Sequence, residues 1–207
     1  MPRVGHIAAS HELATRDRVM RTMVERFGPC RIAKSTDDHF TALAESIVYQ
    51  QLAGAAAAAI WGRTRALFDG GFTPEAVLAT REARLRKAGL SPAKAASIRD
   101  LAAKVVDGTV PIRALSRMRD EALIERLVVV RGIGRWTAEM FLMFQLRRID
   151  VWPVDDYGVR KGYTRAYGLP ELPKPKELMA LGERFRPYRS VAAWYCWRAV
   201  EAKDGPA

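Results

Sequence analysis

Hydrophobic residues recur three and four positions apart in most segments of this chain, between breaks made by glycine and proline. This spacing is typical of helices that bury one face, and no segment shows the alternation of a half-buried strand. The pattern therefore predicts an all-α fold. The expected helices with both ends given are residues 12–27, 80–89, 91–108, 118–130, 176–186 and 190–202. Another helix runs from 38 towards 50, and the next runs from the break that follows it to residue 68. Further helices are expected to begin at residues 74, 135 and 157.

Glycine and proline mark where these helices begin and end. Gly28-Pro29 stops the first helix, and Thr73-Pro74 has the N-cap and first-turn order that favours a helix start. A break is expected near residues 50–54. Residues 1–12 carry no pattern, and the last five residues are expected to form a frayed tail.

One joint between two helices is unusual in sequence. The apolar run 127–130 is followed by Gly132-Ile133-Gly134, and glycine allows backbone angles that other residues avoid. The sequence therefore predicts a tight hairpin in which Ile133 fills the turn. The helix after the hairpin is expected to present Trp136, Met140 and Phe144 on one apolar face.

The hairpin also has the features of a phosphate site. The first amides of the following helix leave a turn without side chains, and exposed amides at a helix N-terminus bind anions. Arg131 and Arg135 flank the turn, and arginine does not lose its charge. The expected phosphate contacts are Arg131, Gly132, Ile133, Gly134, Arg135 and Thr137.

Two adjacent acids follow the hairpin. They end a run from Asp150 that is predicted to be non-helical, because Pro153 keeps Trp152 out of helical geometry. An acid such as Asp155 or Asp156, placed just past a phosphate-binding hairpin, suggests chemistry on nucleic acid.

The motif Leu-x-x-x-x-Gly-Ile-Gly-x-Trp-Thr-Ala-x-Met-Phe, followed by Asp-Val-x-Pro-x-x-Asp, resembles the helix-hairpin-helix superfamily of DNA glycosylases. The match is closest to the alkylation-repair branch, the 3-methyladenine DNA glycosylase II type, and covers roughly residues 38–198. The resemblance implies two helical lobes with a cleft between them. Residues 38–150 would form the central lobe with the hairpin, and residues 1–37 plus 151–207 the second lobe.

Charge and cysteine content narrow the function classes. The 34 Lys and Arg against 23 Asp and Glu give a net charge of +11, spread along the chain. This excess favours a polyanion partner over the alternative of an arginine-rich protein without one. Cys30 and Cys196 are too few for a disulfide framework or an iron–sulfur site, and the three histidines lack ligand spacing. With no visible signal peptide or membrane-length apolar run, the expected location is the cytoplasm or nucleoid.

The resemblance implies that Asp156 is catalytic. Cleavage of the glycosidic bond of a flipped nucleotide passes through a positively charged sugar, which a carboxylate can stabilise. In the alkylation branch the second acid of such a pair has this role. Asp155 is expected to cap the helix that begins at Tyr157, and capping is also the alternative for Asp156.

Trp136 stands where bifunctional members of the superfamily have a lysine, which forms a Schiff base with the sugar and cuts the strand. Tryptophan cannot do this, so the resemblance implies base removal alone; the alternative role for Trp136 is that of a core aromatic. Cationic alkylpurines stack on electron-rich rings. The implied base pocket contains Trp136, Trp197, Tyr49 and Met140, the last at a position where relatives often have tyrosine.

Other features implied by the resemblance lie around the hairpin. Gln51 and Leu52 match the segment that fills the gap left by the flipped base, although an ordinary helix end is the alternative. Residues 89–95 resemble the hairpin in sequence, which would make Lys94 a second phosphate contact. The alternative is that any two joints between helices look alike. Hairpins of this family bind a monovalent cation, Na⁺ or K⁺, through main-chain carbonyls. Here those would belong to Val128, Val130 and Gly132, and no other cofactor is expected.

The resemblance thus implies a monomeric, monofunctional DNA glycosylase of base excision repair. It would hydrolyse the N-glycosidic bond of alkylated purines in double-stranded DNA, 3-methyladenine first, and leave an abasic site. A non-catalytic binder of DNA structure and a bifunctional glycosylase for oxidised bases are the alternatives. The acid after the hairpin argues against the first, and Trp136 argues against the second. The sequence does not define the range of lesions.

Overall fold

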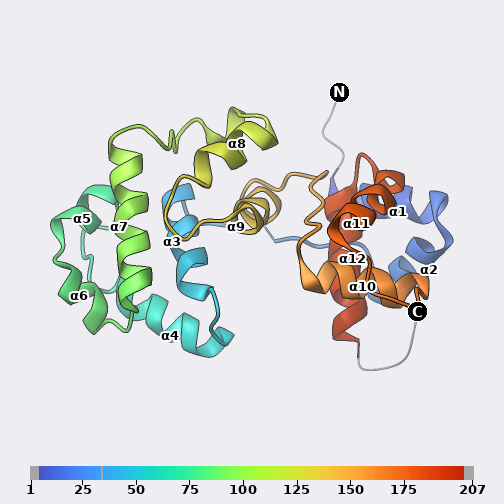
Figure 1. Cartoon of the computed structure of the whole chain (residues 1–207), viewed down its shortest axis with the longest axis horizontal. Coiled ribbons are helices and arrows are strands. Elements are labelled where there is room, and N and C mark those ends of the chain that lie inside the picture. The colour runs from blue at the N-terminus through green and yellow to red at the C-terminus, as the bar shows by residue number, and fades with distance from the viewer. Residues whose placement is uncertain (1–4, 34, 203–207) are drawn as a thin grey trace. The chain divides into compact units, whose positions relative to one another are not determined.

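The computed structural model describes residues 5–33 and 35–202. Over these residues the chain forms twelve α-helices with two short 3-10 helices, one π-helical turn and no strand, so the predicted all-α class is confirmed. The chain divides into two compact units, drawn in Figure 1. Unit 1 is Met1–Lys34 with Leu142–Ala207, and unit 2 is Ser35–Phe141.

Unit 1 is built from both ends of the chain. Its helices are α1 (His6–Arg16), α2 (Arg18–Phe27), α10 (Tyr157–Tyr167), α11 (Pro175–Gly182), η3 (Glu183–Phe185) and α12 (Arg189–Glu201). The π-helical turn η2 (Phe141–Gln145) begins at the last residue of unit 2. In the core of unit 1, Gly162 has no side chain and so lets α10 pack closely on α12. A Cβ at this position would overlap the carbonyl oxygen of Cys196. Tyr163, Phe185 and Tyr195 are fully buried there.

Unit 2 is the continuous middle of the chain. Its helices are α3 (His39–Tyr49), α4 (Gly54–Arg65), α5 (Pro74–Ala79), α6 (Glu82–Lys87), α7 (Pro92–Val106), η1 (Leu115–Arg117), α8 (Asp120–Leu127) and α9 (Arg135–Met140). The long helix α7 packs against α3 and α5 (Figure 1). Leu43, Ile47, Ile98 and Leu101 are fully buried along these helices, at the spacings that the sequence pattern predicted.

The N-terminal segment differs from the prediction. A single helix over residues 12–27 was expected after an unpatterned start, but α1 begins at His6 and the chain breaks at Asp17, which has extended angles (φ −138°, ψ 123°). Its Oδ1 accepts a hydrogen bond from Met20 N–H at 3.0 Å and so caps α2. The buried face of α1 includes His6, Ala9 and Ser10, which a hydropathy pattern does not detect. Residues 1–4 and the predicted tail at 203–207 lie outside the described residues.

The apolar residues predicted on one face of the helix after the hairpin are not part of the core. Trp136 is 44% exposed and Phe144 is 41% exposed, whereas Ala138, Phe141 and Leu142 are buried. The helix is also short, because α9 ends at Met140 and the chain continues as the π-helical turn η2. A π-turn shifts the angular position of each later side chain relative to a regular α-helix.

Candidate active site

The hairpin in unit 2 is a tight turn between α8 and α9. Ile133 N–H donates to Val130 O at 3.0 Å, and the Ile133 side chain is buried. Gly132 has φ +78°, in the left-handed region, and a Cβ there would lie 2.7 Å from Ser97 Oγ. Gly134, the N-cap of α9, has φ −92° and ψ 174°, and a Cβ there would meet nothing within 4 Å. Gly132 is therefore required by the fold, whereas the fold itself would accept a side chain at Gly134.

An acid that the sequence analysis missed holds the main chain of the hairpin. Asp100, on α7, accepts a hydrogen bond from Arg131 N–H at 2.7 Å and pairs with Lys104 Nζ at 2.5 Å. Burial acts to raise the pKa of Asp100, but these two hydrogen bonds outweigh it and leave the pKa below its ordinary value. No spacing rule links Asp100 to a residue 31 positions later, so this contact could not be expected from the sequence.

The two arginines of the hairpin have different surroundings. Arg135 donates to both carboxylate oxygens of Glu121, at 3.0 and 2.5 Å, and its Nε lies 3.1 Å from Glu139. The Arg135 hydrogen bond lowers the pKa of Glu121, and the pair reciprocally raises the pKa of Arg135. The side chain of Arg131 is exposed and forms no salt bridge within the described ranges, although its charge helps to lower the pKa of Asp100. Of the two, Arg131 is the better placed to bind a phosphate.

The predicted wedge follows α3 and lies beside the hairpin in unit 2. Gln51 has φ +57°, and Tyr49 and Leu52 are 37% and 39% exposed. Gln50 Nε2 donates to Gly132 O at 2.9 Å and lies 3.3 Å from Thr137 Oγ1. Two segments 82 positions apart, the end of α3 and the hairpin, are thus joined by one side chain. Thr137, an expected phosphate contact, is buried in this junction.

Lys94 was expected to contact phosphate through a second glycine turn. In the structure its Nζ donates to two main-chain carbonyls, Val48 O at 2.6 Å and Gln50 O at 2.8 Å. Burial lowers the pKa of Lys94, while the two carbonyl contacts favour its charged form.

Asp156 lies in unit 1 at the start of α10. Its Oδ1 accepts hydrogen bonds from Val159 N–H at 2.7 Å and from Trp197 Nε1–H at 2.9 Å. Asp156 is therefore the cap of this helix, and the expectation that Asp155 caps it is wrong: Asp155 is exposed. The cap sits one position later because α10 begins directly after Asp156.

The ring that donates to this carboxylate is part of a stacked aromatic pair in unit 1. Trp197 stacks on Phe144, with ring centroids 5.7 Å apart and planes at 26°. Gly158 makes room for Trp197, since a Cβ there would lie 2.8 Å from Trp197 Cδ1. Phe144 and Gly158 are site residues that the sequence analysis did not assign. The expected pocket residues Trp136, Met140 and Tyr49 lie in unit 2, and Trp136 and Tyr49 are exposed there.

The carbonyls expected to bind a monovalent cation are part of the hairpin turn. Val130 O accepts from Ile133 N–H, and Gly132 O accepts from Gln50 Nε2. A carbonyl oxygen has two lone pairs, so each of these can still contribute one to a cation. The donor set fits Na⁺ or K⁺, and the site stays a prediction. Side chains offer no substitute, because no group of three His, Cys, Asp or Glu placed for a metal occurs in the described part of the chain.

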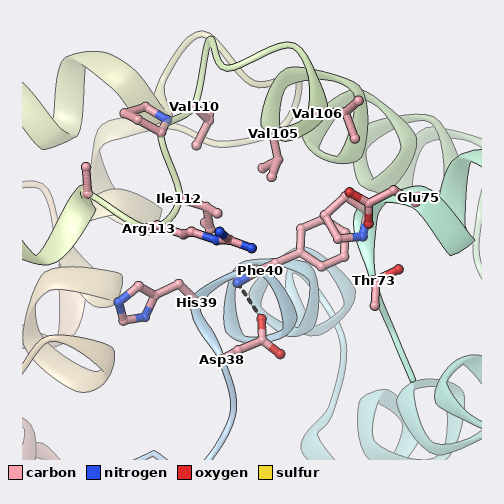
Figure 2. Close-up of a pocket in the computed structure, with 13 residues that line it drawn as sticks. Asp38, His39, Phe40, Thr73, Glu75, Val105, Val106, Val110, Ile112 and Arg113 are labelled. Carbon is pink, nitrogen blue, oxygen red and sulfur yellow. Dashed lines mark hydrogen bonds between the residues drawn. The ribbon is translucent and has the colours of Figure 1, made fainter. Parts of the chain in front are cut away.

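Unit 2 also contains a cavity of about 650 Å³ away from these residues (Figure 2). It is lined by the starts of α3 and α5, the end of α7 and the loop through Ile112, and none of its lining residues is a predicted site residue. Asp38 beside it accepts from Phe40 N–H at 2.9 Å, which caps α3.

No helix in the described ranges is long and apolar enough to cross a membrane.

Comparison with known proteins decides the family. Residues 44–187 match the family model described as HhH-GPD superfamily base excision DNA repair protein. The chain belongs to the HhH-GPD superfamily. This HhH-GPD chain is 33% identical over 201 residues to DNA-3-methyladenine glycosylase 1 of Schizosaccharomyces pombe, covering 95% of this chain and 88% of that protein.

Solved structures show the same HhH-GPD fold. The S. pombe 3-methyladenine DNA glycosylase in complex with abasic DNA aligns with a TM-score of 0.84 and 32% identity, over 96% of this chain and 99% of that one. A DNA-3-methyladenine glycosidase from Bacillus halodurans aligns with a TM-score of 0.81 and 36% identity, over 90% and 86% of the two chains.

Proposed function

We propose that this chain is a monofunctional DNA glycosylase that hydrolyses the N-glycosidic bond of alkylated purines in duplex DNA. The observation that carries the proposal is the carboxylate of Asp156, oriented by Trp197 and Val159 at the start of α10. A protein that only gripped DNA would gain no affinity from a carboxylate, because it repels phosphates. The names of the relatives, which are 3-methyladenine glycosylases, support the substrate class.

The reaction replaces the C1′–N bond of the flipped nucleotide by a bond to water oxygen. A cationic alkylpurine leaves as a neutral base, positive charge develops on the sugar, and the attacking water loses its proton to solvent. The Asp156 carboxylate stabilises that charge and orients the water, and its fixed orientation spares reorganisation during the reaction. The Trp197 ring, which is bonded to this carboxylate in unit 1, would hold the cationic base by stacking.

The tryptophan at position 136, where bifunctional members have a lysine, supports hydrolysis without strand cleavage. Position 136 carries tryptophan, and Lys94 Nζ donates to two main-chain carbonyls, contacts that favour its protonated, non-nucleophilic form. The net charge of +11 fits duplex DNA as the partner. A monomer acting at the nucleoid is the proposed working form.

The experiment is release of free base from methylated duplex DNA, measured by chromatography. Wild-type protein should release 3-methyladenine, and Asp156→Asn should release almost none. Asp155→Asn is the matched control, since it removes the same charge one residue away. Activity lost in Asp155→Asn and kept in Asp156→Asn would transfer the catalytic role to Asp155, and no release by the wild type would disprove the function.

A further inference from the structure

The turn after α3, residues Gln50 to Leu52, has an unusual backbone for its sequence. Gln51 has φ +57°, a left-handed conformation that residues with a side chain seldom adopt. Such a conformation persists only where surrounding contacts hold it, and it occurs most often at functional sites. We call residues 50–52 the wedge turn, since Leu52 projects from it with a partly exposed apolar side chain.

Lys94 holds the wedge turn from the side of α7. The last carbonyls of a helix have no partner within the helix, and a cation there is favoured by the helix dipole. Lys94 Nζ donates to two such groups, Val48 O at 2.6 Å and Gln50 O at 2.8 Å. The lysine itself is fixed in the first turn of α7, whose cap Ser91 accepts from Lys94 N–H at 3.3 Å. Two of the three ammonium protons are therefore engaged within the protein.

Gln50 holds the same turn from the side of the hairpin. Its amide donates to Gly132 O at 2.9 Å, so a side chain of the wedge turn is bonded to the main chain that is expected to bind phosphate. Thr137 Oγ1, 3.3 Å from the same nitrogen, provides a second acceptor. Gln50 is therefore held at two points: Lys94 binds its main-chain carbonyl, and the hairpin accepts a hydrogen bond from its side chain.

We propose that Lys94 is a positioning residue for the wedge turn, which together with Gln50 fixes the wedge on the hairpin before DNA binds. The inference rests on the proposed function, because a wedge matters only to a protein that flips a nucleotide. Inserting an apolar side chain between bases costs unstacking energy, and a wedge that is already ordered adds no further entropic cost. Lys94 would then govern base flipping and would contribute little to the affinity for phosphates.

The test compares Lys94→Met with wild type on two duplexes. In one the methylated purine faces its normal partner, and in the other it faces an abasic site, where less pairing opposes flipping. Losing two hydrogen bonds to a charged group should slow single-turnover excision of the paired lesion by about tenfold or more, and slow excision opposite the abasic site much less. Lys94→Arg, which can still donate to both carbonyls, should recover most of the paired-lesion rate. Lys176→Met, an exposed lysine of unit 1, is the matched control and should match wild type.

Two further measurements separate the explanations. The slope of binding affinity against salt should be unchanged in Lys94→Met, whereas loss of a phosphate contact would reduce it by about 0.9. Fluorescence of 2-aminopurine beside the lesion reports unstacking without any excision, so it tests the wedge even if the wild type releases no base. That signal should fall in Lys94→Met.

Equal slowing on both duplexes with a shallower salt slope, or an unchanged unstacking signal, would overturn the proposal. If circular dichroism shows that Lys94→Met is unfolded, Gln50→Leu removes the other tie and is expected to show the same selective loss on the paired lesion.

Discussion

The indole of Trp197 and the carboxylate of Asp156 are joined by a hydrogen bond of 2.9 Å, on the same oxygen that caps α10 through Val159. Two donors on one oxygen restrict the rotation of the carboxylate. The Trp197 ring is in turn supported by Phe144, which stacks on it 5.7 Å away. The resemblance assigned these two residues to separate roles, catalysis and base stacking, but in the structure they are directly hydrogen-bonded.

Replacing Trp197 by phenylalanine separates these two roles. The Trp197→Phe variant keeps a ring that can stack on Phe144 and on a base, but it loses the N–H donor to Asp156. Because a hydrogen bond to a charged group contributes about 1.5–3 kcal/mol, single-turnover base release should slow by about tenfold or more. Affinity for DNA with an abasic site should stay close to that of the wild type. A variant with wild-type rate would show that the hydrogen bond does not contribute to catalysis.

Neutralising Asp156 should affect catalysis and binding in opposite directions. Asp156→Asn still offers an oxygen to Val159 N–H, so the fold should be retained. Base release should nearly disappear, while affinity for abasic-site DNA should equal or exceed that of the wild type, because a negative charge near phosphate is removed. Fluorescence anisotropy at fixed salt measures this affinity. Weaker binding by Asp156→Asn would show that the carboxylate supports the complex instead of opposing it.

The sequence alone predicted the features whose cause is local. The turn at Gly132 could be expected because only glycine readily adopts its φ of +78°, and α7 and α12 follow from helical spacing. The contacts of Gln50, Lys94 and Asp100 could not be predicted, because each joins segments more than 30 residues apart. The end of α9 at Met140 could not be predicted, because a π-helical turn leaves no clear signature in the hydrophobic pattern.

The two glycines of the hairpin should respond differently to alanine. Gly132→Ala places a Cβ at φ +78° and 2.7 Å from Ser97 Oγ, so the free energy of unfolding should fall by about 1–2 kcal/mol from the backbone alone. Gly134→Ala meets open space in extended geometry and should leave thermal stability nearly unchanged. It should nevertheless weaken binding to every DNA sequence alike, since a methyl group would stand where phosphate approaches the amides. Unchanged DNA affinity in Gly134→Ala would remove the hairpin from the DNA interface.

The two arginines of the hairpin should also differ. Arg131→Gln should reduce the slope of log affinity against log salt by about 0.9, the value for one lost phosphate contact. Arg135→Gln breaks the pairs with Glu121 and Glu139, which leaves the largely buried Glu139 without that cation. It should therefore lower the melting temperature more than Arg131→Gln does and change the salt slope less. The opposite order would mean that Arg135 leaves its acids to bind phosphate.

The central claim is that this protein removes bases by hydrolysis and leaves the strand intact, and trapping with borohydride tests it most directly. Wild-type protein is incubated with a methylated duplex in the presence of borohydride, and the products are separated on a denaturing gel. With Trp136 in place of a lysine, no covalent protein–DNA adduct should form, and strand breaks should appear only after hot alkali. Trp136→Lys should not become an efficient lyase, because the new amine would stay protonated in this exposed position. A borohydride-stable adduct with the wild-type protein would contradict the account.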